Sequence, residues 1–176
     1  MNISEFIDET IKKDMYRDIR KMISENIAIP CIISLFAYSE VIGAIERIIR
    51  GESENMVFGS GQSNRNFEAY MEIAGKAYKN IEPRNVYRLF RGGLIHRYFP
   101  ERRLLIKMNT EDPVGLLEYG RGCPISIEGD ILTFNVNQYF HDMKQAVNRM
   151  KKQLKRQHKE EVELYRGRNG ILVQRE

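Results

Sequence analysis

The residues of this chain whose types and spacing could do chemistry lie in the stretch YRLFRGGLIHRYFP, residues 87–100. Arg91 precedes His96 by five residues, and two glycines lie between them. Histidine can take or give a proton at neutral pH because its ordinary pKa is about 6.5. A guanidinium stays charged and can bind phosphate oxygens through two parallel hydrogen bonds. Side by side, the two residues could hold a phosphodiester and move a proton next to it.

A helix must position these residues, and Pro83 is well placed to open it because proline suits the first helical turn. On a helical wheel of about 100° per residue, one stripe is apolar and should face the core: Val86, Tyr87, Phe90, Leu94 and Tyr98. Arg91 and His96 lie about 140° apart on the same wheel, with Gly92 between them. A phosphate or a second copy of the helix could approach the backbone there. The alternative is a helix that kinks at its glycines and leaves Arg91 and His96 solvated.

The spacing Arg91-x-x-x-x-His96, after an apolar helix pattern in a small helical chain, resembles the R-x(4–6)-H motif of the HEPN superfamily. That superfamily consists of helical domains and includes many metal-independent RNases, often toxins or antiviral effectors. The resemblance covers about residues 30–105, with the apolar helix that carries Glu40 ahead of the motif and the aromatic Phe99 just after it. Active members commonly have Asn, Asp or His directly after the arginine, where this chain has Gly92, a departure that concerns catalysis more than fold.

The resemblance implies a homodimer in which two such helices meet and both Arg/His pairs line one cleft. RNA brings its own nucleophile, the 2′-hydroxyl, so His96 would act as general base or acid and Arg91 would stabilise the developing charge. The products would be a 2′,3′-cyclic phosphate and a 5′-hydroxyl, with no metal or other cofactor. The residues expected to bind RNA phosphates or to stack on a base are Arg84, Arg88, Arg97, Arg102, Arg103 and Phe99.

Glu40 is a candidate supporting residue, because it is interpreted as the one acid inside the most apolar helix, where an unpaired carboxylate is costly. A partner from the next part of the chain, an arginine or His96, would orient the imidazole and raise its pKa. The structural alternative is a salt bridge that fixes the register of two helices.

Composition bounds the class of protein. The 176 residues are 42% hydrophobic and 30% charged, and this length and composition suit one compact domain over residues 1–176. The net charge is +4. No apolar run is expected to reach the roughly 20 residues that a bilayer requires, so the chain is predicted to be cytoplasmic, without membrane contact. Cys31 and Cys123 have no paired spacing and are expected to serve packing.

The predicted fold is mainly α, a bundle of four to five helices with a small β-hairpin before the C-terminal helix. An amphipathic helix is expected from Ile3 to about Asn26, a central apolar helix over residues 31–51, and a third helix over residues 67–78. The Gly-, Ser- and Asn-rich residues 51–66 indicate a mobile surface loop. The hairpin is predicted at about residues 124–136. A long basic helix is predicted at about residues 137–165, with one apolar side: Phe140, Met143, Val147, Met150 and Leu154.

The sequence is therefore compatible with two functions from different classes. The first is a HEPN-like endoribonuclease, and the second is a non-catalytic HEPN-like module that binds RNA or a partner protein such as an antitoxin; Gly92 favours the second. A weaker third reading is a structural subunit whose cationic patches bind an acidic partner. The basic C-terminal helix could follow a nucleic-acid backbone, although a charge run of this kind is more often a solvated face.

Overall fold

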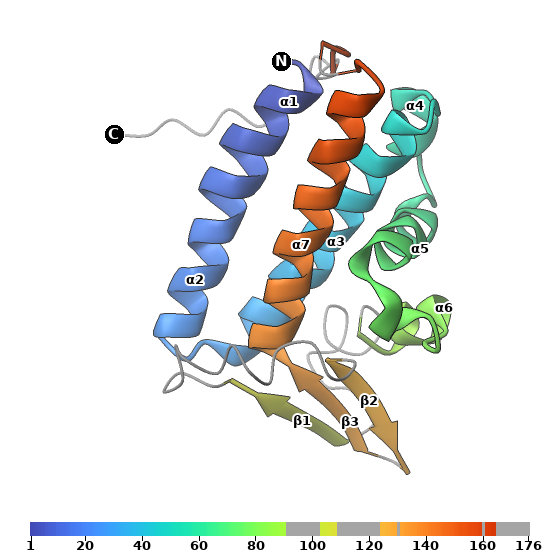
Figure 1. Cartoon of the computed structure of the whole chain (residues 1–176). Coiled ribbons are helices and arrows are strands. Elements are labelled where there is room, and N and C mark those ends of the chain that lie inside the picture. Colours follow the sequence, from blue (N-terminus) through green and yellow to red (C-terminus); the bar gives the residue numbers. More distant parts are fainter. Residues whose placement is uncertain (91–102, 109–123, 130, 160, 165–176) are drawn as a thin grey trace.

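The computed structural model describes residues 1–90, 103–108, 124–129, 131–159 and 161–164. It confirms a mainly helical fold with a small sheet before the C-terminal helix. The elements, in chain order, are α1 (Ile3–Glu5), η1 (Phe6–Met15), α2 (Tyr16–Ser24), α3 (Ala28–Ile49), α4 (Glu54–Val57), α5 (Ser63–Ala74), η2 (Lys76–Tyr78), α6 (Pro83–Tyr87), β1 (Arg103–Lys107), β2 (Ile125–Glu128), β3 (Ile131–Asn135) and α7 (Val136–Arg156). The long helices run side by side, α4 to α6 lie along one flank, and the sheet closes one end (Figure 1).

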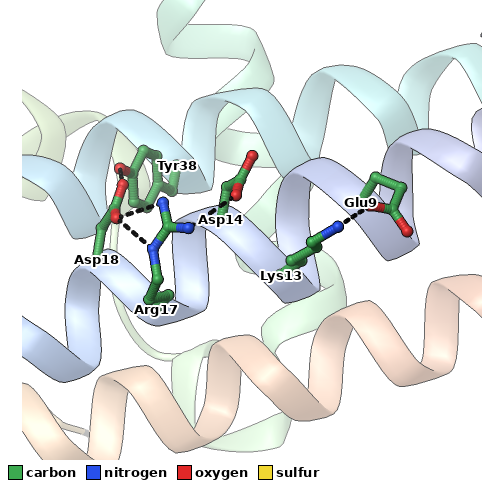
Figure 2. Close-up of polar contacts among 6 residues, drawn as sticks. All are labelled: Glu9, Lys13, Asp14, Arg17, Asp18 and Tyr38. Atoms are coloured by element: carbon green, nitrogen blue, oxygen red, sulfur yellow. Dashed lines mark hydrogen bonds and ion pairs between the residues drawn. The ribbon is translucent and has the colours of Figure 1, made fainter. Parts of the chain in front are cut away.

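The N-terminal helix forms as predicted and ends at Ser24, but its middle, η1, is a π-helix of ten residues. Ile3, Ile7 and Ile11 recur every four residues along the N-terminal helix and are fully buried, so they form its inward face. The opposite side carries surface ion pairs such as Lys13 to Glu9 at 2.6 Å (Figure 2). Because such exposed pairs contribute little stability, the isoleucine face holds this helix to the bundle.

Aromatic rings fill the centre of the core. The ring of Phe36 on α3 stacks on Phe67 of α5, on Phe90 and on Tyr139 of α7, at centroid distances of 5.2, 4.3 and 5.8 Å. Phe134 of β3 packs against the same ring at 5.8 Å. Offset and edge-to-face aromatic pairs add stability beyond the apolar area they bury, so this cluster joins three helices and the sheet at one point.

The prediction of a mobile loop over residues 51–66 is wrong. The segment contains α4 and the start of α5, and it folds around the buried guanidinium of Arg47, which is 3% exposed. Arg47 donates to both carboxylate oxygens of Glu52, to Oε1 of Gln62 at 3.1 Å and to Oδ1 of Asn66 at 2.6 Å. The polar residues that suggested a solvated loop are instead the partners that a buried cation requires.

The hairpin is confirmed, with β2 antiparallel to β3 and a turn at Gly129, whose φ is +60°. The sheet also has a third strand that the sequence did not predict. β1 pairs parallel to β3, in the order β1-β3-β2, and brings Leu104 and Ile106 opposite Leu132 and Phe134. A short strand between charged residues gives little local signal, because its partner lies far along the chain.

Helix α7 ends earlier than predicted, at Arg156 rather than near residue 165. His158 follows in a left-handed conformation with φ +53°, and the chain then turns back. Glu163 forms an antiparallel bridge with Asn2, and the amide of Leu164 donates to the carbonyl of Met1 at 3.0 Å. Pairing with the N-terminus thus replaces the last predicted turns. The buried face of α7 is as predicted: Phe140, Met143, Val147, Met150 and Leu154.

Candidate functional site

The structure describes the approach to the predicted motif but not the motif itself. Six predicted site residues lie outside the described residues: Arg91, Gly92, His96, Arg97, Phe99 and Arg102. Arg103 begins β1, and its side chain is not described. The described members of the set are Glu40, Arg84 and Arg88.

Helix α6 precedes the motif and bears out the described part of the predicted apolar stripe, whose members Leu94 and Tyr98 lie outside the described residues. Pro83 occupies its first turn, and the helical backbone continues through Phe90. Val86 and Phe90 are each 2% exposed, whereas Arg88 is exposed on the opposite side. The residue directly before Arg91 is therefore fixed in the aromatic core.

Arg84 is exposed, but it takes part in an ion pair. Its Nε donates to Oε1 of Glu68 on α5 at 2.7 Å, an ion pair that joins α6 to α5. Among the described arginines of the predicted RNA-binding set, Arg88 alone has an exposed side chain without such an ion pair. An arginine bound to a carboxylate offers fewer donors to a phosphate, so Arg88 has more free donors than Arg84.

The interpretation of Glu40 as the one interior acid of the apolar helix is wrong. Glu40 is half-buried, and the acid that α3 buries is Glu46, which is 1% exposed. Oε1 of Glu46 accepts from Nε of Arg50 at 2.9 Å, and Arg50 also donates to Glu72 of α5 at 2.6 Å. The sequence carried this signal, since Glu46 and Arg47 interrupt the same apolar run that drew attention to Glu40.

A cavity of about 540 Å³ lies between α5, η2 and α6, beside the helix that leads to the motif. Its apolar lining includes Met71, Tyr78 and Ile81. Its charged lining is Glu68, Glu72, Lys79, Glu82 and Arg84. The volume lies within the range of about 300–1,000 Å³ that is typical of ligand sites, and no sequence pattern pointed to it, because three elements contribute to it.

Behind this cavity, Tyr78 reaches α7. Its hydroxyl donates to Oδ2 of Asp142 at 3.1 Å, and Nε2 of Gln138 donates to Oδ1 at 2.9 Å. Burial raises the pKa of Asp142 above its ordinary value of 3.8, and these two hydrogen bonds oppose the rise. Because the raised pKa belongs to the folded state, the contribution of Asp142 to the free energy of unfolding falls as the pH rises from about 3.8 through the raised value.

The variant Tyr78→Phe should raise the pKa of Asp142 further, because it removes a donor that favours the carboxylate. The carboxyl ¹³C shift of Asp142, followed by NMR across a pH titration, measures this directly. Tyr38→Phe is the matched control, since the hydroxyl of Tyr38 donates instead to Asp18 at 3.4 Å, as Figure 2 shows. A pKa of Asp142 that falls or stays unchanged in Tyr78→Phe would contradict the described hydrogen bond.

Part of the basic C-terminal segment is used within the fold. Arg149 donates to the carbonyls of Ile73 and Ala74 and so caps the C-terminal end of α5. Lys151 binds Asp8, and Lys159 donates to the carbonyl of Ile49 at the end of α3. Three cations that could suggest a nucleic-acid surface therefore serve the packing of other helices.

Two searches of the described residues bear on metals and membranes. Among these residues, no group of three or more His, Cys, Asp or Glu side chains could hold a metal ion. Helix α3, at 22 residues, is long and apolar enough to cross a bilayer by length and composition, contrary to the expectation that no run would be. Half of the most apolar stretch of α3 is buried inside the bundle. The core helix of a soluble protein can have the same length and apolar composition.

The chain was compared with known proteins at three levels. No family model, no curated protein and no solved structure matches it. The resemblance to HEPN domains thus depends on the motif and on the helical fold alone.

Proposed function

We propose that this protein is a metal-independent endoribonuclease with a HEPN-like fold, in which Arg91 and His96 act on RNA. The observation that supports it is the anchoring of the residue before the motif. Phe90 is 2% exposed, and its ring stacks on Phe36 at 4.3 Å in the core of a mainly helical bundle. Reacting groups must be positioned precisely, which requires a rigid support. Phe90, directly before Arg91, provides such a support.

In this mechanism the 2′-oxygen of RNA attacks the neighbouring phosphorus while His96 accepts its proton. The bond from phosphorus to the 5′-oxygen breaks, and that oxygen leaves with a proton from a histidine or from water. Arg91 binds the non-bridging oxygens, on which negative charge grows in the transition state. The chain end left behind is a 2′,3′-cyclic phosphate, and the leaving end is a 5′-hydroxyl.

The proposal includes a cytoplasmic homodimer that needs no cofactor, with RNA as substrate and an antitoxin-like protein as a further partner. Two copies of the motif helix would bring both Arg/His pairs to one cleft. The exposed Arg88, four residues before Gly92 in the sequence, would bind a phosphate on the approach to that cleft.

Purified protein should cut mixed cellular RNA in EDTA and leave cyclic phosphate ends, and His96→Ala should lower the rate at least about a hundredfold, as loss of a general acid or base does. His158→Asn is the matched control, because His158 is exposed and its left-handed backbone suits asparagine. End-group analysis of the fragments gives the result. Cleavage that persists in His96→Ala, or that EDTA abolishes, would contradict the proposal.

The second candidate is a non-catalytic module that binds RNA, and Gly92 is the observation that favours it, because active relatives by motif carry a polar residue there. This candidate predicts RNA binding that weakens in Arg88→Ala and is unchanged in His96→Ala, with no cleavage under any condition. A structural subunit that binds an acidic protein would have no RNA affinity at physiological salt.

A further inference from the structure

The cavity between α5, η2 and α6 combines three kinds of lining that together suit one class of ligand. Its floor is apolar, with Met71 only 3% exposed and Ile81 packed against the core. Its charged lining combines the carboxylates of Glu68, Glu72 and Glu82 with the cations Lys79 and Arg84. A nucleotide has matching parts: a flat base with apolar faces, N–H donors on the base edge, and an anionic phosphate.

Two of the three carboxylates that line the cavity are held in place by arginines, which offset their charge, whereas Glu82 accepts from the neutral amide of Asn85. Oε1 of Glu68 accepts from Arg84, and Oε2 of Glu72 accepts from Arg50. Glu68 and Glu72 lie one helical turn apart on α5, so their side chains are neighbours on one face. Each carboxylate thus has a second oxygen that can accept from a ligand, while its arginine limits the repulsion of a phosphate.

Two adjacent acceptors of this kind select among the bases. A carboxylate accepts hydrogen bonds and donates none. Guanine presents two neighbouring donors, N1–H and N2–H, on its Watson–Crick edge. Adenine and cytosine present one donor group beside an acceptor, and uracil presents one donor between two acceptors. An acceptor of the ligand that faces a carboxylate would be left unpaired, which costs binding free energy.

The cavity also lies close to the residue that precedes the motif. Arg84 lines the cavity, and Phe90, directly before Arg91, is six residues further along the same helical backbone, a rise of about 9 Å along the axis at 1.5 Å per residue. A base held in the cavity would therefore belong to a nucleotide near the phosphate that the motif acts on.

We propose that the cavity between α5, η2 and α6 binds a guanosine nucleotide, with the base on the Met71 floor, its donors on Glu68 and Glu72, and its phosphate near Lys79. The choice of a guanosine nucleotide as the ligand rests on the described residues that line the cavity. That the guanosine is part of an RNA substrate rests on the proposed function.

Binding is tested first, without any requirement for cleavage. Protein labelled with ¹³C at the methionine methyls is titrated with GMP, AMP, CMP and UMP, and the signal of Met71, assigned with Met71→Leu, reports on the cavity. GMP should shift this signal and bind at least about tenfold more tightly than the others. The double variant Glu68→Gln/Glu72→Gln should lose this preference, because each amide can turn a donor toward the base.

Glu9→Gln is the control, since Glu9 is also a helical glutamate in an ion pair, 59% exposed and on η1. It should bind GMP as the wild type does, and thermal melting should show that all variants are folded. Equal binding of the four nucleotides, absence of binding, or an unchanged preference in the double variant would each overturn the inference.

A cleavage assay with RNA separates this inference from the proposed function. Two oligonucleotides that differ in a single G→A exchange are incubated with the protein and with Glu68→Gln/Glu72→Gln. Cutting near the guanosine that is lost in the exchanged RNA and in the double variant supports both proposals. Cutting that depends on His96 but ignores the guanosine overturns the inference alone. Selective GMP binding without cleavage of any RNA supports a mononucleotide site and counts against the endoribonuclease.

Discussion

Replacing Gly43 with alanine should unfold the protein at temperatures at which the wild type is folded, with a loss in the free energy of unfolding of about 3 kcal/mol or more. A Cβ at this position would lie 1.8 Å from the carbonyl oxygen of Asn66 and 2.8 Å from the amide nitrogen of Tyr70. Both are backbone atoms of α5, so no side chain can rotate away. Helices α3 and α5 would have to separate, and the Arg47 contacts and the aromatic cluster would separate with them.

Thermal and urea unfolding followed by circular dichroism measure this effect. Gly61→Ala is the control, because an added Cβ there meets nothing within 4 Å and only the left-handed backbone, φ +77°, is strained. That strain should cost about 1 kcal/mol. A Gly43→Ala protein that unfolds with the control would mean that α3 and α5 do not cross as closely as described.

Arg47→Met should cost about 3–5 kcal/mol, because removing one partner of a buried ion pair leaves the others without compensation. Glu52, Gln62 and Asn66 all accept from this guanidinium. The loss should be concentrated in residues 51–66, which should exchange amide hydrogens faster and become sensitive to proteases. Arg47→Lys should be intermediate in stability, since an ammonium keeps the charge but not the bidentate geometry.

Arg17→Met provides the comparison, since Arg17 also contacts two acids, Asp14 and Asp18, as Figure 2 shows, but its side chain is 54% exposed. Its removal should change the free energy of unfolding by less than about 1 kcal/mol. The pKa of Glu52 gives an independent reading. Hydrogen bonding to Arg47 lowers it below the ordinary value, so it should rise in Arg47→Met and stay low in Arg17→Met. Equal stability of the two variants would contradict the buried network.

Gly43→Ala and Arg47→Met also bear on the candidate site. Helix α5 carries Asn66 and Tyr70, which meet α3, and Glu68 and Glu72, which line the cavity. Any change that moves α5 away from α3 should therefore also weaken nucleotide binding. Substitutions that act on the cavity alone, such as those of the two glutamates, should leave the unfolding transition nearly unchanged.

The sequence by itself determined the helical class, most helix positions, the hairpin, and the buried faces of the N-terminal and C-terminal helices. These features depend on periodicity and on turn residues, which act over a few neighbouring positions. The stripe of Val86 and Phe90 is the clearest case, because the wheel predicted the side of α6 that the structure buries. The Arg91 and His96 pair was predicted in the same way, from its spacing, and lies outside the described residues.

Only the tertiary structure decided which charges are buried and where a cavity forms. Residues 51–66 have the composition of a solvated loop, yet Arg47 holds them through contacts that span up to 19 positions. Strand β1 exists because β3 pairs with it, and Arg149 and Lys159 cap helices far away in the sequence. The physical reason is common to all of these. A buried ion or an unpaired strand becomes favourable only once distant partners supply its hydrogen bonds, and no local pattern records which partners those will be.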